Sequence, residues 1–223
     1  MTRMFRWSRF ARTTRAASMV TLLAMGAGCA LTSKADSVVL RYFTPERMTA
    51  RTATPPPPQG ADSRNLQLRL GRVQAASYLR DKIAFRDSDY EVGYYEDWRW
   101  TEKPESYVRR AAGRALFEDQ RIRQVISGPA PTLEVVVNAF EELRVPRHVA
   151  RVEVTWSLRD DQSVLMQRTV MVEHAIENGK PEAQASAVAN AMADALGEAV
   201  TTLVTGVVVE LSRTPPPPQP PPS

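Results

Sequence analysis

Cysteine and histidine are scarce in this chain, and their scarcity excludes several kinds of chemistry. The 223 residues include one cysteine, Cys29, and two histidines, His148 and His174. A single cysteine cannot form an intramolecular disulfide, so the core must be stable without one. The two histidines form no ligand-spaced set such as H-x-x-x-H, so we expect no metal site.

The common catalytic motifs are also missing. The sequence has no G-x-S-x-G elbow, no Walker loop and no dinucleotide-binding fingerprint. Two acidic pairs, Glu141-Glu142 and Asp160-Asp161, lie at a predicted strand end and in a predicted turn, where paired carboxylates are usually solvated. We therefore expect neither enzymatic activity nor a bound cofactor, and we assign no catalytic residues.

The N-terminal segment has the pattern of a secretory signal. Five arginines before Ala16, with no acidic residue, precede an uncharged run of 13 residues at 16–28. A membrane-spanning helix needs roughly 20 apolar residues, whereas a secretory signal needs about 7–15. The small residues Gly26, Ala27 and Gly28 then lead directly into Cys29. Residues 1–28 are therefore predicted to be a signal peptide.

This segment resembles a bacterial lipoprotein signal, whose cleavage site ends in small residues followed by cysteine. The resemblance implies that the Cys29 sulfur receives a diacylglycerol and that its new amino group is acylated, typically with palmitate. Gly26 departs from the leucine usual at that position. The alternative is an ordinary secreted protein in which Cys29 has no role.

Removal of residues 1–28 changes the charge of the chain. The whole chain has 29 basic and 25 acidic residues, but the part after residue 28 has 24 basic and 25 acidic residues. The sequence pI of about 9.4 therefore reflects mainly the signal segment. A nucleic-acid-binding protein would need a basic surface on its folded domain, so we do not expect nucleic acid as a partner.

Proline divides the remaining chain. A tether at 29–37 precedes a domain at 38–212, which contains a proline-rich loop at 44–64, and a proline-rich tail follows at 213–223. Proline fixes φ and lacks a backbone donor, so these two tracts are predicted to be extended or irregular. Both are interpreted as solvated segments, with recognition by a partner left open.

Strand patterns recur through the domain. Early strands are predicted at 38–43 and 65–73, and two more, joined by a turn at 86–89, within 78–100. Alternating apolar residues then predict a meander of three strands over 133–143, 150–158 and 164–175, with a bulge near Met166.

Two segments have the period of an amphipathic helix. Pro104 opens the first, at 104–118, and Pro181 opens the second, at 181–207. The second is predicted to bury Val188, Met192, Leu196, Ala199 and Leu203. Residues 119–126 could extend the first helix or form a short strand. The fold class predicted is α+β: a single domain with an antiparallel β-sheet covered on one face by two helices.

Six aromatic residues lie between Tyr90 and Tyr107 in a chain that is only 7% aromatic. Such a cluster can fill a core or form the contact surface of an interface. As a candidate surface for a partner or for self-association we select four of them: Tyr94, Tyr95, Trp98 and Trp100.

Over residues 78–117 the sequence resembles a known family. The similar segments are Tyr94-Tyr95-Glu-Asp-Trp98-Arg-Trp100 and the helix Pro104-Glu-Ser-Tyr-Val108-Arg-Arg-Ala-Ala-Gly-Arg-Ala-Leu116. They resemble the auxiliary lipoproteins of ABC-type transport systems, including the lipoprotein of the paraquat-inducible intermembrane transport operon. The proline tracts at 55–58 and 215–222 are additions to that pattern.

The resemblance implies a periplasmic component of an envelope system that transports lipids or other hydrophobic substrates. Its partners would be an MCE-type substrate-binding protein, a permease and an ATPase, with a homo-oligomer left open. Ala30 is not the aspartate that retains lipoproteins in the inner membrane, which favours the periplasmic face of the outer membrane. The alternatives are a lipid-binding carrier module and a structural lipoprotein of the cell envelope.

The lipid anchor gives the first testable prediction. Replacing Cys29 by serine removes the sulfur that would carry the diacylglycerol, so the Cys29→Ser protein should leave the membrane fraction for the soluble fraction. Fractionation followed by immunoblotting measures this. Retention of the variant in the membrane fraction would show that the tether is not the Cys29 lipid.

Overall fold

The computed structural model describes residues 38–46, 66–177 and 183–213 of the chain. The predicted signal segment, Cys29, most of the proline-rich loop and the proline-rich tail lie outside the described residues. The described elements are eight strands and two helices, the first of which continues as a π-helical segment.

The predicted meander forms the largest part of the sheet. It consists of β6 (Thr132–Leu143), β7 (Val149–Arg159) and β8 (Val164–Ala175), paired in antiparallel fashion. Alternate β7 residues from Ala150 to Leu158 are buried, as their apolar pattern predicts. A register shift where β8 begins, between Val164 and Met166, confirms the predicted bulge.

The other edge of β6 is shared by two shorter strands. β2 (Gln67–Ala75) pairs with its first half and β3 (Lys82–Arg86) with its last residues, and both run parallel to it. β4 (Gly93–Trp100) forms an antiparallel hairpin with β3, and β1 (Arg41–Phe43) runs parallel to β4.

The sheet is therefore mixed, whereas the sequence predicted an antiparallel sheet. Only the meander and the β3–β4 hairpin are antiparallel. Alternation of apolar residues is the same in both kinds of pairing, but a parallel neighbour requires a long crossover connection. Here the helical segment between β4 and β6 provides that connection.

Both predicted helices are present. α2 (Pro104–Gly113) continues as the π-helical segment η2 (Arg114–Asp119), and α3 (Gln184–Arg213) runs six residues beyond its predicted end. After η2 the backbone reverses at Arg121, with φ of 57°, into the two-residue strand β5 (Arg123–Gln124). The segment left open at 119–126 thus ends the helix and then forms a short strand.

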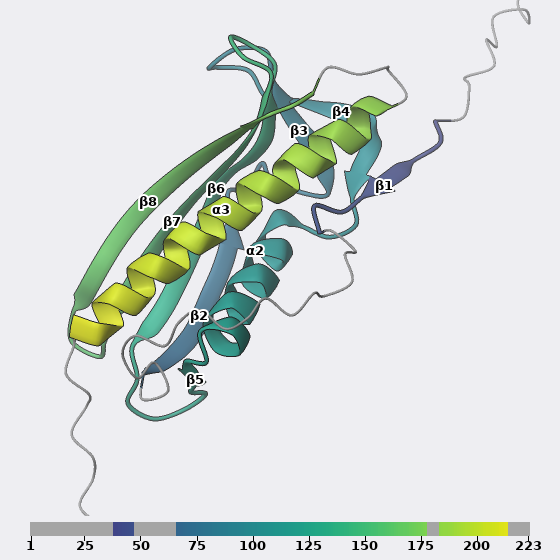
Figure 1. Cartoon of the computed structure of the whole chain (residues 1–223). Helices are drawn as coiled ribbons and strands as arrows, with labels where there is room; N and C mark the ends of the chain where they lie inside the picture. Colours follow the sequence, from purple (N-terminus) through teal and green to yellow (C-terminus); the bar gives the residue numbers. More distant parts are fainter. Residues whose placement is uncertain (1–37, 47–65, 178–182, 214–223) are drawn as a thin grey trace, which may run out of the picture. The chain divides into compact units, whose positions relative to one another are not determined.

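The two helices cover the same face of the sheet. Figure 1 shows α3 lying along β7 and β8, with α2 beside it over β2. All five residues predicted for the buried stripe of α3 are buried. By length and composition α3 could also cross a membrane. However, its buried residues recur from Ala185 to Leu211 and pack into the core, as in the central helix of a globular domain.

Candidate functional site

The four aromatic residues selected from the sequence do not share one surface. Trp100 is 1% exposed and Trp98 is 8% exposed, so both belong to the hydrophobic core. Tyr95 is half-buried, and its ring stacks on Trp98 with 3.8 Å between centroids. Tyr94 is 37% exposed. Of the two roles considered for the aromatic cluster, the two tryptophans therefore have the core role. Tyr94 is the one exposed residue of the four.

Two adjacent glutamates on β6 are buried instead of solvated, which corrects the prediction from their sequence. Glu141 and Glu142 are each 1% exposed. They follow a register shift between Val137 and Ala139, and from Ala139 to Leu143 every β6 residue is buried. Neighbouring residues of a strand point to opposite faces, so this end of β6 is covered on both sides. Buried carboxylates need partners, and each glutamate has its own.

The partners of Glu141 come from β3 and the segment before it. Arg86 Nε lies 2.7 Å from Glu141 Oε1, and the Tyr78 hydroxyl lies 3.0 Å from Glu141 Oε2. Burial first, and then the negative charge of Glu141, raise the pKa of Tyr78 to about 12. Burial alone would lower the pKa of Arg86, but its bond to Glu141 raises it above the usual value. Both pKa shifts favour the neutral Tyr78 hydroxyl and the charged Arg86 guanidinium, which are the forms that bond to Glu141.

The partners of Glu142 come from β4 and from the turn before β7, where Arg144 Nε lies 3.8 Å from Glu142 Oε1. Glu142 Oε2 accepts a hydrogen bond from the Tyr95 hydroxyl of β4 at 2.6 Å, and its Oε1 lies 2.6 Å from Nε2 of His148, which precedes β7. The same His148 nitrogen lies 3.3 Å from Gln184 Nε2, at the start of α3. Burial first, and then the bond to Glu142, raise the pKa of Tyr95 above its usual range. Glu142 therefore links β4 to the turn before β7, and through His148 to the start of α3.

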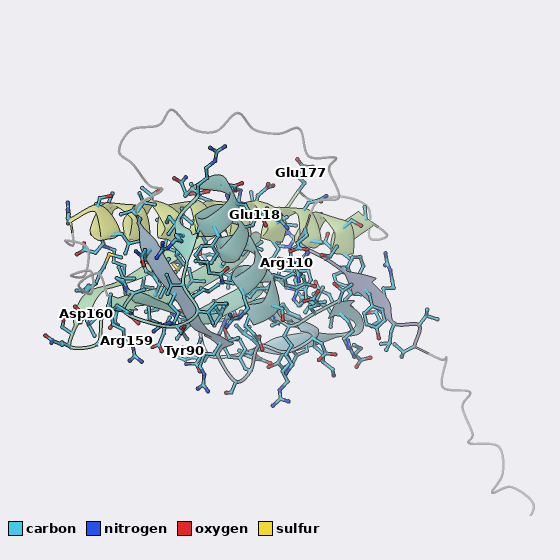
Figure 2. All side chains as sticks on the ribbon, turned by 90° about the horizontal axis from the view of Figure 1, so that it is seen from below. Tyr90, Arg110, Glu118, Arg159, Asp160 and Glu177 are labelled. Atoms are coloured by element: carbon cyan, nitrogen blue, oxygen red, sulfur yellow. The ribbon has the colours of Figure 1, made fainter. Side chains whose placement is uncertain are left out.

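The β3–β4 turn and the β6–β7 turn lie side by side above these clusters. The backbone N–H of Arg144 donates to the Arg86 carbonyl at 3.0 Å, and the Arg144 guanidinium lies 3.5 Å from the centre of the Phe85 ring. Tyr90 in the first turn is 97% exposed, and Val145 in the second is 58% exposed. Tyr90 is labelled in Figure 2. We call Tyr90, Tyr94 and Val145 the turn surface.

The two clusters join buried carboxylates to partners from neighbouring segments of the domain. Each glutamate is engaged with a cation or hydrogen-bond donor of the same domain, which fixes the turns beside it. Among the residues that the structure describes, no group of three or more His, Cys, Asp and Glu side chains could hold a metal ion. Elsewhere, Arg110 on α2, which is labelled in Figure 2, forms ion pairs with Glu46 and Glu102. The bond to Glu46 is the main reason that the pKa of Arg110 lies above the usual value.

Comparison with known proteins identifies the family. The family model described as "ABC-type transport auxiliary lipoprotein component" matches residues 49–204. The chain belongs to the ABC-type transport auxiliary lipoproteins. The sequence resemblance at 78–117 is thereby confirmed. No curated protein matches this auxiliary lipoprotein significantly.

Solved structures show the same fold. The crystal structure of protein XCC0632 from Xanthomonas campestris has a TM-score of 0.60 and 21% identity, covering 78% of this chain and 98% of that one. An uncharacterized protein has a TM-score of 0.58 and 13% identity, with 76% and 99% covered. At these identities the likeness concerns the fold of the auxiliary lipoprotein alone.

Sequence reasoning missed Tyr78, Arg86 and Arg144 as members of the site. The one local signal was the acidic pair itself, which follows the apolar pair Ala139-Phe140 at the end of β6 in this auxiliary lipoprotein. Charged residues are rarely buried without a partner, so an acidic pair inside a strand predicts partners. The partners themselves could not be identified from local patterns, because Arg86 on β3 lies 55 residues before Glu141 in the sequence.

Removing the cation beside Glu141 should destabilise the fold. In Arg86→Gln, Glu141 stays buried without its guanidinium, so we expect the free energy of unfolding to fall by about 3 kcal/mol in urea denaturation. Adding Glu141→Gln should restore part of this loss. As the matched control, Arg147→Gln breaks an ion pair to Glu173 whose arginine is 74% exposed, and should cost less than about 1 kcal/mol. Equal losses for both arginines would contradict the assignment.

The raised pKa of Tyr78 predicts a loss of stability in alkali. Its pKa is about 12 in the folded protein against an ordinary value of 10.0. Between these values the unfolded chain loses the phenolic proton while the folded protein keeps it, so unfolding becomes easier as pH rises from 10 to 12. The stability advantage of wild type over Tyr78→Phe should shrink by about 1 kcal/mol across this range, since partial exposure screens the shift. A constant advantage in urea denaturation would contradict the prediction.

Proposed function

We propose that this auxiliary lipoprotein is a non-catalytic docking component of an envelope transport system. It would be anchored by the Cys29 lipid at the periplasmic face of the outer membrane, without a further cofactor. There it would hold the MCE-type substrate-binding component that works with a permease and an ATPase. The observation that carries the proposal is the family match over residues 49–204.

The turn surface supports a docking role. Tyr90 and Val145 expose apolar area on two adjacent turns, and Tyr94 does so at the start of β4. Tyrosine is enriched in protein interfaces. The buried clusters around Glu141 and Glu142 fix these turns against the sheet. A surface that is ordered before binding loses little conformational entropy when a partner binds.

The packing of the domain favours docking over the alternative role of a lipid carrier. A carrier that encloses its lipid needs a chamber between the sheet and the helices. Here the described side chains between α3 and the sheet form one continuous hydrophobic cluster that includes Trp156, Leu203 and Val207. The partner therefore is expected to contact the outside of the domain.

Crosslinking in native membranes tests the proposal. The full-length protein, crosslinked in cells and identified by mass spectrometry, should capture an MCE-domain protein encoded near an ATPase and a permease gene. The double variant Tyr90→Asp with Val145→Asp should lose most of this product, because charged groups replace the apolar contacts. Ile126→Asp is the control, since Ile126 is 90% exposed but lies outside the turn surface.

Two results would contradict the proposal. If no MCE-domain protein, permease or ATPase is captured by the wild type, the docking role is wrong. If the double variant captures the partner as well as Ile126→Asp does, the role of the turn surface is wrong while the docking role stands.

A further inference from the structure

The strand β1 and the residues just before it expose three large apolar side chains within four positions. Val39 is 74% exposed, Leu40 is 45% exposed and Tyr42 is 61% exposed. A single exposed apolar residue is ordinary, but a contiguous group of them marks a surface that contacts a partner or a membrane. We call Val39, Leu40 and Tyr42 the β1 patch.

β1 is held to the domain along one edge and by one side chain. It runs parallel to β4, from Arg41 beside Trp98 to Phe43 beside Trp100, and no other described strand pairs with it. The Phe43 ring packs against the core, with its centroid 6.1 Å from that of Trp98. Successive residues of a strand point to opposite faces, so Tyr42 faces away from that contact. The β1 patch is therefore an outward surface on a strand that Phe43 fixes to the core.

The tether keeps the β1 patch close to the proposed anchor. Nine residues, 30–38, separate Cys29 from Val39. An extended chain spans at most about 3.5 Å per residue, so Val39 stays within about 35 Å of the anchored cysteine. For comparison, the 30 residues of α3 are about 45 Å long. The tether thus restricts the β1 patch more closely than the rest of the domain.

The residue types suit the boundary between water and lipid. Tyrosine is enriched at that boundary, and arginine can lay its alkyl stem on apolar groups while its charge stays in water. Arg41, which is exposed, lies between Leu40 and Tyr42 in the sequence. The unpaired edge of β1 carries backbone groups that need water, which excludes burial in the hydrocarbon interior. These features fit a shallow contact at the level of the lipid head groups.

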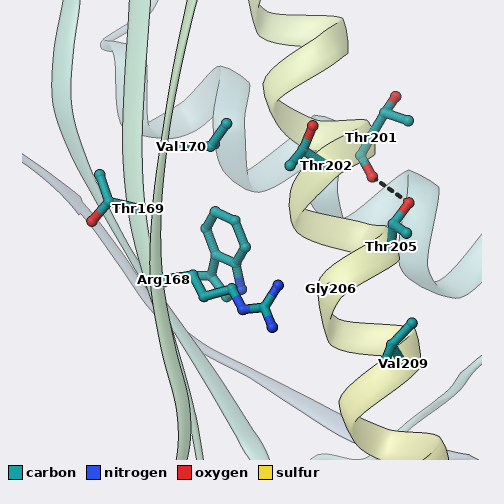
Figure 3. A pocket seen from close by; sticks show the side chains of 9 residues that line it. Arg168, Thr169, Val170, Thr201, Thr202, Thr205, Gly206 and Val209 are labelled. Atoms are coloured by element: carbon teal, nitrogen blue, oxygen red, sulfur yellow. Dashed lines mark hydrogen bonds between the residues drawn. The ribbon is translucent and has the colours of Figure 1, made fainter.

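The helix α3 is the other described element that could contact a membrane, since it is long and apolar enough to cross one. Its apolar side is packed into the core, and of its large apolar residues only Val209 is exposed. Figure 3 shows Thr201, Thr202 and Thr205, all exposed, with the Thr205 hydroxyl donating to the Thr201 carbonyl at 2.8 Å. The outer side of α3 is therefore polar, which leaves the β1 patch as the better membrane contact.

We propose that the β1 patch makes a second contact with the bilayer that carries the anchor, through shallow insertion of Val39, Leu40 and Tyr42. The tether makes this contact intramolecular, so a weak apolar interaction is sufficient. A tether alone leaves the domain free to rotate, whereas a contact through a strand fixed to the core orients it on the membrane. The proposal rests on the Cys29 anchor of the proposed function and goes beyond the docking role.

An added strand is the competing occupant of this surface. Another chain could pair with the open edge of β1 and cover the same side chains. Strand addition requires a second protein chain, whether another copy or a transport component. Contact with the bilayer requires only a vesicle. A test with sparsely distributed protein on vesicles therefore separates the two.

The chain from Cys29 to Ser223 is suitable for the test. All described strands and helices lie between Arg41 and Arg213. The crystallised Xanthomonas protein matches 78% of this chain over 98% of its own length. The domain is thus expected to fold without the signal segment, which circular dichroism checks. Cys29 is the one cysteine, so its thiol can be coupled to a maleimide lipid in phosphatidylcholine vesicles. This supplies the anchor whether or not Cys29 is acylated in cells.

Quenching of tryptophan fluorescence by brominated phosphatidylcholine measures the contact. Leu40→Trp places a new tryptophan in the β1 patch. Ile126→Trp is the matched control, because Ile126 is 90% exposed and follows β5, at the opposite end of the strand order from β1. The native tryptophans of this chain are buried and give a common background: Trp98, Trp100 and Trp156.

The added fluorescence of Leu40→Trp should fall at least about twofold when the vesicles are brominated, because an interfacial apolar residue reaches the start of the acyl chains. That of Ile126→Trp should stay unchanged. Equal quenching of the two variants, or none of Leu40→Trp, would overturn the proposal. Quenching that disappears at lower protein density would also overturn it, since the contact would then need a second copy.

A further variant shows whether the patch itself makes the contact. Adding Val39→Asp and Tyr42→Asp to Leu40→Trp should abolish most of the quenching, because charged groups resist leaving water. Persistent quenching would show that the tether alone brings position 40 to the lipid, and the β1 patch would have no role. No transport partner is present in these vesicles, so a negative result leaves the docking role and its crosslinking test untouched.

Discussion

The long strand β6 is the element on which the rest of the sheet depends. One of its edges carries the β7–β8 meander, and the other is divided between β2 and β3. Because β2 and β3 occupy successive parts of one edge, the β3–β4 hairpin is displaced toward the end of the sheet. Both helices then pack on one face, and β7 carries Arg151, Glu153, Thr155 and Ser157 on the opposite face. The buried glutamate clusters and the turn surface follow from this division.

The buried glutamates are the electrostatic consequence of that division. β3 reaches only the last residues of β6, and it brings Arg86 against Glu141, while Tyr95 of β4 reaches Glu142. A buried carboxylate is costly without a partner, so these pairs are satisfied only when β3, β4 and α3 hold their places together. The clusters thus tie the registers of separate elements to one another and keep the adjacent turns fixed. An apolar replacement could fill the space but would not fix those registers.

Much of the fold could be predicted from local patterns. Alternation on β7 from Ala150 to Leu158 and the helical spacing from Val188 to Leu203 identified both the elements and their buried faces. The strand directions could not be obtained in this way, because parallel and antiparallel strands have the same period of two. The limits of α3 were also misjudged. Gly206 lowers helix propensity, but Val207 and Leu211 beyond it are buried in the core and the helix continues to Arg213.

The sequence by itself determined the element types, the core faces, the family and the candidate anchor at Cys29. Only the tertiary structure decided that Trp98 and Trp100 are buried and that Glu141 and Glu142 have partners. It also decided that Leu40 and Tyr42 are exposed. The physical reason is that periodicity and composition are properties of neighbours along the chain. The burial and charge environment of a side chain are instead set by neighbours in space, and these come from segments far apart in the sequence.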